Sequence, residues 1–106
     1  MFRIIEYTYL GLDTVKAFPN PWKPDKGGMQ DADFITFKNL PEEGTIRIYN
    51  VVGEMVKKID FTAVDDGFSS WDGSNDSGNK VSSGIYITYI EDTNGSHRIL
   101  KIAYVK

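Results

Sequence analysis

The stretch Ser83-Gly84-Ile85-Tyr86-Ile87-Thr88 decides the fold class, because it opens a segment of alternating side chains that continues to Glu91. Residues two apart in a strand share one face, so this alternation predicts a strand with one buried face. A second alternating segment, residues 97–105, follows the pair Asn94-Gly95, which is typical of a two-residue hairpin turn. The end of the chain is therefore predicted to be a β-hairpin.

Short alternating segments of the same kind extend toward the N-terminus, and no stretch has the spacing of an amphipathic helix. Turn residues separate these segments at roughly every 8 to 12 positions, as in all-β domains. The predicted upstream strands cover residues 14–17, 34–39, 45–49, 55–61 and 68–71.

These segments add up to about seven strands, the number found in an immunoglobulin-like sandwich. The fold class is therefore predicted to be all-β, an immunoglobulin-like antiparallel β-sandwich of about seven strands with essentially no helix. The length of 106 residues and a hydrophobic fraction of 41% are enough for one core. The residues expected in that core are Ile35, Phe37, Ile46, Ile48 and Val56.

Charge and composition exclude several function classes. A net charge of −3, with lysines spread along the chain, gives no basic stripe, so nucleic acid is not an expected partner. No apolar run approaches the roughly 20 residues that cross a bilayer, so no membrane span is expected. The charges at Arg3 and Glu6 come too early for a signal peptide. The absence of cysteine excludes disulfides and thiolate metal sites and leaves the compartment open.

Two aromatic residues are expected to stabilise the sandwich. In immunoglobulin-type folds a tyrosine early in the penultimate strand bonds back to the preceding loop through its hydroxyl, and Tyr86 is the candidate for this corner. Thr88 stands two residues later, where an antibody domain has cysteine, so the sheets must be joined by packing alone. Trp71 is expected to supply much of that packing, since a buried tryptophan removes on the order of 150–250 Å² from water.

Eight short motifs follow one another along residues 15–106: Phe18-Pro19-Asn20-Pro21-Trp22-Lys23-Pro24, Ile35-Thr36-Phe37-Lys38-Asn39-Leu40-Pro41, Ile46-Arg47-Ile48-Tyr49-Asn50, Gly53-Glu54-Met55-Val56, Trp71-Asp72-Gly73, Asn75-Asp76-Ser77-Gly78, Val81-Ser82-Ser83-Gly84-Ile85-Tyr86 and a basic last residue. In this order they resemble the C-terminal immunoglobulin-like domains of large exported bacterial proteins. These domains are related to type IX secretion sorting domains and to the immunoglobulin-like domain of the flagellar hook-capping protein. Within the motifs Pro19, Pro21 and Gly84 are assigned structural roles, the prolines in a loop or sheet edge where amide donors are missing.

The resemblance also divides the chain. Residues 14–106 are expected to be the sandwich module, placed at the C-terminus of a larger protein. Residues 1–13 are expected to be the end of a preceding domain, a linker or an extra edge strand. The alternative that they form a native first strand of this domain stays open.

A calcium loop is one alternative for ligand binding. Asp72, Ser74 and Asp76 offer hard oxygen ligands. The sixth and twelfth positions counted from Asp72 are Ser77 and Ser83, however, where a dedicated loop has glycine and glutamate. Ordinary turn chemistry, with Asp72 accepting backbone N–H groups, is the main expectation. No metal or cofactor is therefore expected.

Two further sites have less support. His97 has no serine or cysteine nucleophile motif near it and is expected to be a solvated strand residue, so no catalytic residue is assigned and the chain is expected not to be an enzyme. Trp22 and Tyr49 offer an aromatic platform for a sugar ring, although the motifs favour packing roles for both.

Two function classes remain open. In the first, the chain is a non-catalytic sorting or anchoring module of a secreted or cell-surface bacterial protein, with an upstream passenger domain and export machinery as partners. In the second, it is a structural spacer or assembly domain of the hook-capping type that contacts neighbouring subunits. A carbohydrate- or calcium-binding module comes third. The expected contact surfaces are the final strand, residues 99–106, and the proline-rich loop, residues 18–24.

Overall fold

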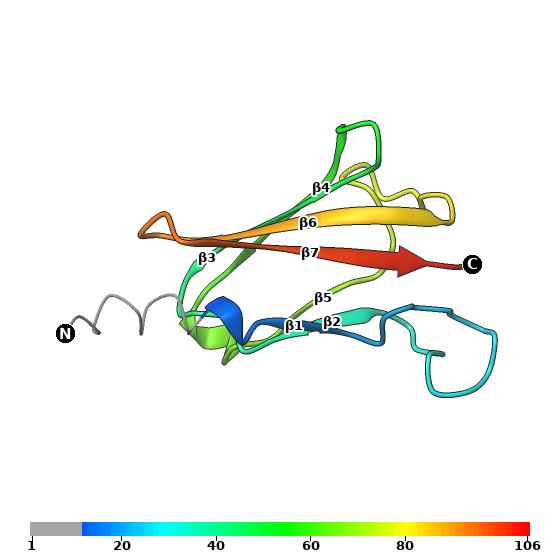
Figure 1. Cartoon of the computed structure of the whole chain (residues 1–106), viewed down its shortest axis with the longest axis horizontal. Helices are drawn as coiled ribbons and strands as arrows, with labels where there is room; N and C mark the ends of the chain where they lie inside the picture. Colours follow the sequence, from blue (N-terminus) through cyan, green and yellow to red (C-terminus); the bar gives the residue numbers. More distant parts are fainter. Residues whose placement is uncertain (1–11) are drawn as a thin grey trace.

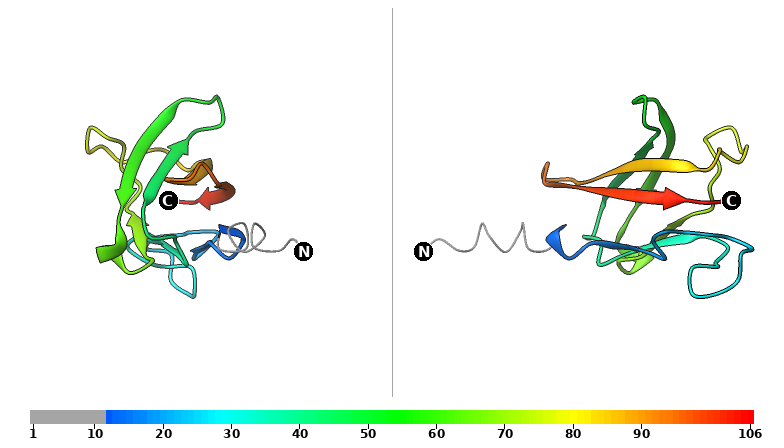
Figure 2. Two further views of the ribbon diagram at one scale, coloured as in Figure 1. Left: turned by 90° about the vertical axis from the view of Figure 1, so that its left-hand side faces the viewer. Right: turned by 45° about the vertical axis from the view of Figure 1, so that its right-hand side comes forward.

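The computed structural model describes residues 12–106, which form two antiparallel β-sheets packed face to face (Figure 1). The smaller sheet has the order β1-β2-β5, with β1 at Lys16–Phe18, β2 at Ile35–Lys38 and β5 at Ser69–Trp71. The larger sheet has the order β4-β3-β6-β7, with β3 at Gly44–Tyr49, β4 at Met55–Phe61, β6 at Gly84–Asp92 and β7 at His97–Tyr104. The predicted seven-stranded immunoglobulin-like sandwich is confirmed, and Figure 2 shows the strong twist of its larger sheet.

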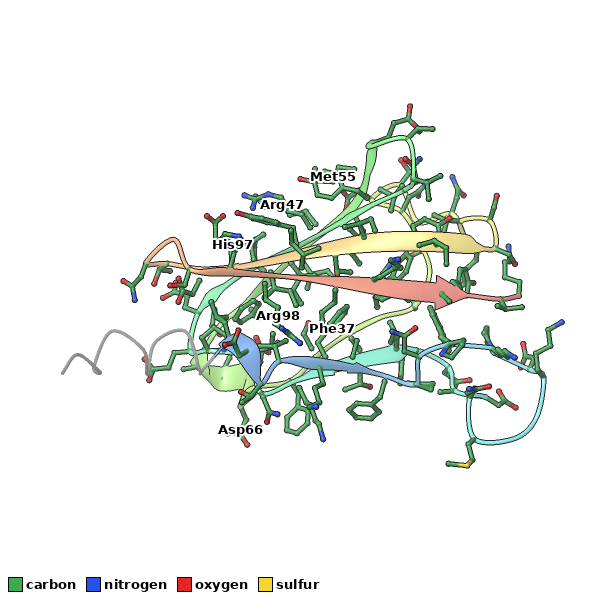
Figure 3. The ribbon with its side chains drawn as sticks, viewed as in Figure 1. Phe37, Arg47, Met55, Asp66, His97 and Arg98 are labelled. Carbon is green, nitrogen blue, oxygen red and sulfur yellow. The ribbon has the colours of Figure 1, made fainter. Side chains whose placement is uncertain are left out.

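The core lies between the two sheets, where the inward faces of the strands meet. Ile35, Phe37, Ile46 and Ile48 are fully buried, as their alternation predicts. Figure 3 shows Phe37 projecting from β2 into the space between the sheets. Thr88 is also fully buried, and its hydroxyl donates to the Leu100 carbonyl at 2.8 Å. The buried polar group is therefore satisfied within the larger sheet.

The prediction that Val56 belongs to the core is wrong, because this residue is only partly buried. Between β3 and β4, Ile48 pairs with Lys57 and Tyr49 pairs with Met55, so Val56 has no partner across the ladder. An extra residue of this kind is a β-bulge, which bends the strand and disturbs its alternation. Regular alternation would place Val56 on the outward face with Lys58 and Asp60, and the bulge lets it pack partly against the core instead.

The first strand begins later than predicted. Leu12 and Asp13 have helical backbone, and the Val15 N–H donates to the Leu12 carbonyl at 3.0 Å, so a turn precedes β1. Leu12 and Val15 are both buried in the core. The division of the chain into residues 1–13 and 14–106 stays a prediction, because residues 1–11 lie outside the described part.

Helical structure in the described part is short. The 3-10 helix η1 covers Ala63–Asp65, where the Asp65 carboxylate accepts the N–H of Thr62 at 2.8 Å. It leads through Asp66 and Gly67, both with positive φ, to β5. Among residues 12–106 no helix has the length and apolar character that a bilayer crossing requires.

The same turn geometry occurs in three loops, and in each of them a glycine lies three residues after an Asn or Asp. In the β3–β4 loop, Oδ1 of Asn50 accepts the N–H groups of Val52 and Glu54 at 3.1 and 3.0 Å, and Gly53 has a φ of 92°. Oδ1 of Asn75 and Oδ1 of Asp92 accept the N–H groups two and four residues further on in the same way. Glycine suits the positive φ, and the Asn or Asp oxygen satisfies two amides that the turn leaves free.

The β6–β7 hairpin is consequently one residue longer than predicted. Its loop is closed by the Asp92 N–H donating to the Ser96 carbonyl at 3.0 Å, which leaves three residues between them. A two-residue type I′ turn needs positive φ at both central residues, and Gly95 has it whereas Asn94 does not. The connection is therefore a turn ended by a glycine bulge.

Candidate functional site

Four aromatic rings from distant parts of the chain form one cluster at the C-terminal end of the sandwich. This aromatic cluster consists of Trp22, Trp71, Tyr86 and Tyr104, which are between 1% and 5% exposed. Trp22 stacks on Tyr104 with ring centroids 4.5 Å apart, and Trp71 meets the edge of Tyr86 at 5.5 Å. Aromatic contacts of this kind add to the stabilisation from buried area. The structure thus brings the two predicted structural residues, Trp71 and Tyr86, into direct contact.

The polar atoms of the aromatic cluster are satisfied in three cases out of four. The indole N–H of Trp22 donates to the Ala32 carbonyl at 2.8 Å. That of Trp71 donates to Ser74 at 2.8 Å, and the Tyr86 hydroxyl donates to the Ser82 carbonyl at 2.7 Å. The last bond is the corner geometry predicted for Tyr86. Among residues 12–106, no group bonds to the hydroxyl of Tyr104. Burial raises the pKa of this phenol, so the hydroxyl stays protonated and can donate a hydrogen bond.

The proline-rich segment caps the outer edge of β7. The Asn20 side chain donates to the Lys101 carbonyl at 2.8 Å and accepts the Ala103 N–H at 3.1 Å. The Trp22 N–H donates to the Ala103 carbonyl at 2.7 Å, and the Trp22 carbonyl accepts the Val105 N–H at 2.8 Å. The expectation that the whole final strand is open to a receptor is therefore wrong. Its second half and the proline-rich loop form a single hydrogen-bonded surface.

The proposed aromatic platform for a sugar is also wrong. Trp22 is 1% exposed and lies inside the aromatic cluster, while Tyr49 is half-buried on β3 in the larger sheet. A stacking platform needs the faces of both rings at the surface. The packing alternative holds for Trp22, because its ring faces Tyr104.

The 72–80 loop uses its acidic residues for turn and edge contacts. The Asp72 carboxylate accepts the Ser74 hydroxyl at 2.6 Å and the Ser74 N–H at 3.0 Å, which confirms the predicted turn chemistry. Chiefly through the Ser74 hydroxyl, these bonds lower the pKa of Asp72 below its ordinary value of 3.8. Asp76 accepts the Lys58 N–H at 3.3 Å and donates its own N–H to Val56 at 3.0 Å, so it caps the outer edge of β4.

No group of three or more His, Asp or Glu side chains gathers as metal ligands would within residues 12–106. The calcium alternative at Asp72, Ser74 and Asp76 receives no support from this arrangement, because the carboxylate of Asp72 and that of Asp76 already accept hydrogen bonds from Ser74 and Lys58. His97 lies exposed at the start of β7 with its ring stacked on Tyr89, centroids 5.2 Å apart, as expected of a solvated strand residue.

The remaining residues with assigned structural roles sit around the same end. Pro19 and Pro21 follow cis peptide bonds on either side of Asn20. Gly84 begins β6 opposite Tyr104, and a Cβ atom there would meet only the Tyr86 ring at 3.9 Å. The geometry does not demand glycine at that position, so its structural role stays a prediction.

A cavity of about 450 Å³ opens beside the aromatic cluster. One wall is the loop that follows Trp22, with Pro24, Asp25, Lys26 and Asp33, and the opposite wall is formed by Asp72 and Lys80. The end of β7 contributes Tyr104 and Lys106. These segments meet at one end of the molecule, where the C-terminus lies (Figures 1 and 2).

Sequence reasoning did not identify Tyr104 or this cavity. The alternation of residues 97–105 places Tyr104 on the same face as Ile102 and so predicts its burial. No sequence signal pairs it with Trp22, because the contact joins residues that are 82 positions apart by number and depends on how the proline-rich segment crosses β7.

Comparisons with known proteins place the fold. No curated protein matches the chain. Among solved structures, part of PorZ, an essential bacterial surface component of the type-IX secretion system of Porphyromonas gingivalis, is similar with a TM-score of 0.73 and 22% identity over 91% of this chain and 12% of that chain. Part of dimeric latent PorU from the same organism is similar with a TM-score of 0.58 and 22% identity over 86% of this chain and 9% of that chain. The chain therefore spans a small part of the length of either protein.

The family is established by a match that covers more than half of the sequence. The model of the FlgD Ig-like domain matches residues 25–96, which include β2 to β6 and the hairpin that leads into β7. The two-sheet arrangement and the similar solved structures agree with this match. The chain belongs to the FlgD Ig-like domain family.

Proposed function

We propose that this chain is a non-catalytic module that directs or holds a larger bacterial protein at the cell surface, and that it acts at the C-terminus of that protein. The supporting observation is the likeness to PorZ, because it extends over 91% of this chain and concerns a surface component of the type-IX secretion system. In PorZ and PorU the similar region is 12% and 9% of the protein, which suits an appended module. A secreted or cell-surface location follows from the same proposal.

A role in surface recognition suits this sandwich, because it has a filled interior and partly capped strand edges. Its interior is filled by its own side chains, and parts of both outer edges of the larger sheet are capped, β4 by Asp76 and β7 by Asn20. Capping an edge prevents uncontrolled pairing with other chains. What remains for recognition is the part of an edge that is left open.

One open part is the first half of β7. Ala103 and Val105 turn their N–H groups away from β6, and groups with the same orientation recur at every second residue, at Lys101 and Ile99. Within the described chain no partner bonds the outward N–H of Ile99 or Lys101, and Ile99 is 58% exposed. We propose that export machinery contacts this open edge, since a strand edge can take up an extended segment of a partner.

Deletion in the native host tests the role. Residues 12–106 are removed from the full-length protein, and the passenger is followed by cell fractionation and surface proteolysis. Retention of the passenger inside the cell or periplasm supports the sorting role. Unchanged export and surface attachment would overturn it.

Two point variants test the open edge. Ile99→Lys places a charge on it, and Val64→Lys places the same charge on η1, where Val64 is 89% exposed. We expect Ile99→Lys to reduce delivery of the passenger to the cell surface and Val64→Lys to leave it unchanged. Thermal melting curves check that both variants are folded. Equal delivery of the two variants would exclude this edge as the contact.

A structural spacer is the second candidate. The segment that leads into β1 and the C-terminus lie toward opposite ends of the molecule, an arrangement that suits a domain placed in series (Figure 1). Replacing the module with an unrelated sandwich of similar size distinguishes the two functions. Restored surface attachment favours the spacer, and continued loss favours sorting.

A further inference from the structure

The Tyr104 hydroxyl is the unsatisfied polar atom of the aromatic cluster. The residue is 3% exposed, and the other three polar atoms of the cluster bond to backbone carbonyls of the chain. Leaving a buried hydroxyl without a partner costs free energy, and such groups are rare in folded proteins. Because this hydroxyl borders a cavity, a group that enters the cavity can supply the missing hydrogen bond.

The hydroxyl lies at one wall of the cavity described above. A Cβ atom added to Gly73 would stand 2.8 Å from the Tyr104 hydroxyl oxygen, so the hydroxyl sits beside the Asp72-Gly73 backbone. Asp72 and Lys80 line the cavity on this side, and Lys80 donates to the Asp72 carbonyl. A side chain at position 73 would collide with the hydroxyl, so glycine lets the phenol pack against this backbone at the edge of the cavity.

Both walls are held in place by hydrogen bonds that do not involve a ligand. In the loop that follows Trp22, the Asp31 carboxylate accepts the N–H groups of Asp25 and Gly27 at 2.7 and 3.1 Å, and the Lys23 N–H donates to Gln30 at 2.9 Å. On the other side, the Val81 N–H donates to the Gly73 carbonyl at 2.8 Å. The cavity is therefore preformed, as ligand sites usually are.

The charges around the cavity cancel. Three lysines and three aspartates line the cavity: Lys26, Lys80, Lys106, Asp25, Asp33 and Asp72. The Asp72 carboxylate is 4.0 Å from the Lys80 ammonium. The other four charged side chains have no partner among residues 12–106, so two ammonium groups and two carboxylates are free. A site of balanced charge gives no advantage to an anion or a cation.

We propose that this cavity binds a neutral polyhydroxylated ligand, a mono- or disaccharide, with the Tyr104 hydroxyl as its buried anchor. Each sugar hydroxyl can both donate and accept. The free carboxylates of Asp25 and Asp33 accept from such hydroxyls, and the ammonium groups of Lys26 and Lys106 donate to them. The Tyr104 hydroxyl can both donate and accept a hydrogen bond. The cavity volume of about 450 Å³ lies within the range of small-molecule sites. This site is separate from the open edge of β7 and does not rest on the sorting role.

The test is a titration of the full, isotopically labelled chain, followed by backbone amide shifts. The probes are glucose, galactose, mannose, N-acetylglucosamine, maltose and cellobiose at millimolar concentration, with inorganic phosphate as the charged comparison. We expect at least one sugar to shift amides of residues 23–33, 72–80 and 104–106 together, and phosphate not to do so. Shifts with phosphate alone, shifts confined to other residues, or no shift with any sugar would overturn the proposal.

Two matched variants decide whether the hydroxyl is the anchor. Tyr104→Phe removes the unsatisfied hydroxyl and no hydrogen bond within the described chain, so it is expected to fold and to weaken sugar binding by about tenfold, the effect of one lost buried hydrogen bond. Tyr86→Phe removes a hydroxyl of the same cluster that is bonded to Ser82, and it should leave sugar affinity unchanged. Equal affinity of Tyr104→Phe and the unaltered chain would overturn the anchor, and with it the site. Because binding is measured on the isolated chain, its failure would not bear on the sorting role.

Discussion

The side chain of Asn20 accepts the backbone N–H of Ala103 at 3.1 Å, which joins two residues that are 83 positions apart in the sequence. The same side chain donates to the Lys101 carbonyl, so one amide group fits the edge of β7 as a short piece of strand would. The flanking prolines supply no N–H of their own, and the asparagine side chain provides the donor that the edge requires.

Asn20→Ala should open this edge. We expect the free energy of unfolding to fall by about 1–3 kcal/mol, because the Ala103 N–H and the Lys101 carbonyl lose their partner. Urea denaturation measures the loss, and size-exclusion chromatography with light scattering should show self-association through the exposed edge. Asn94→Ala, which alters an exposed loop residue, is the control and should leave both measurements unchanged.

Trp71→Ala should destabilise the domain by about 3–5 kcal/mol, the usual cost of removing a buried aromatic side chain. Trp71 is 1% exposed, contacts the other three rings of the aromatic cluster and donates to the Ser74 carbonyl. Phe68→Ala, at a residue that is 51% exposed, is the matched control and should cost much less. If denaturation finds Trp71→Ala within error of the unaltered chain, Trp71 does not stabilise the core.

Tyr86→Phe and Tyr104→Phe should change the free energy of unfolding by different amounts or in opposite directions. The first removes the bond to the Ser82 carbonyl and should cost about 1 kcal/mol. The second removes a hydroxyl without a partner among residues 12–106 and should leave stability unchanged or raise it. Paired urea titrations check this, and an equal loss for both variants would show that the Tyr104 hydroxyl has a stabilising partner after all.

Stability should fall at alkaline pH. Burial raises the pKa of Tyr86 and of Tyr104 above the ordinary value of 10.0. The unfolded phenols then release protons first, so the free energy of unfolding is retained below about pH 10 and decreases as the pH rises further. The measurement is urea denaturation between neutral and alkaline pH. The double variant with Phe at both positions should show a shallower decrease, and an identical slope would contradict this assignment.

Chelation should leave the melting temperature unchanged. The carboxylate of Asp72 accepts a hydrogen bond from Ser74, and that of Asp76 accepts one from Lys58 at the edge of β4. The loop also lacks the glycine and glutamate of a dedicated calcium site. Melting curves with a chelator and with millimolar calcium provide the comparison. A rise of several degrees on adding calcium would show preferential binding to the folded state and would restore the calcium alternative.

Local patterns predicted much of the fold because period-two alternation reports directly on which side chains face a core. Ile35, Phe37, Ile46 and Ile48 followed that rule, and β4 was predicted with its observed bounds. Val56 did not follow it, since a bulge depends on how two strands pair. The extra residue of the β6–β7 loop also escaped prediction, because Asn94-Gly95 is compatible with two turn geometries and the Asp92 side chain selects one.

The sequence by itself determined the fold class, the family motifs and the burial of Trp71 and Tyr86, since alternation and turn chemistry act over a few residues. The tertiary structure decided what Trp22, Asn20 and Tyr104 do. Trp22 could have faced solvent in a proline-rich loop, and only the crossing of that loop over β7 buries it against Tyr104. Contacts between residues so far apart depend on how two sheets pack, and no local pattern records that packing.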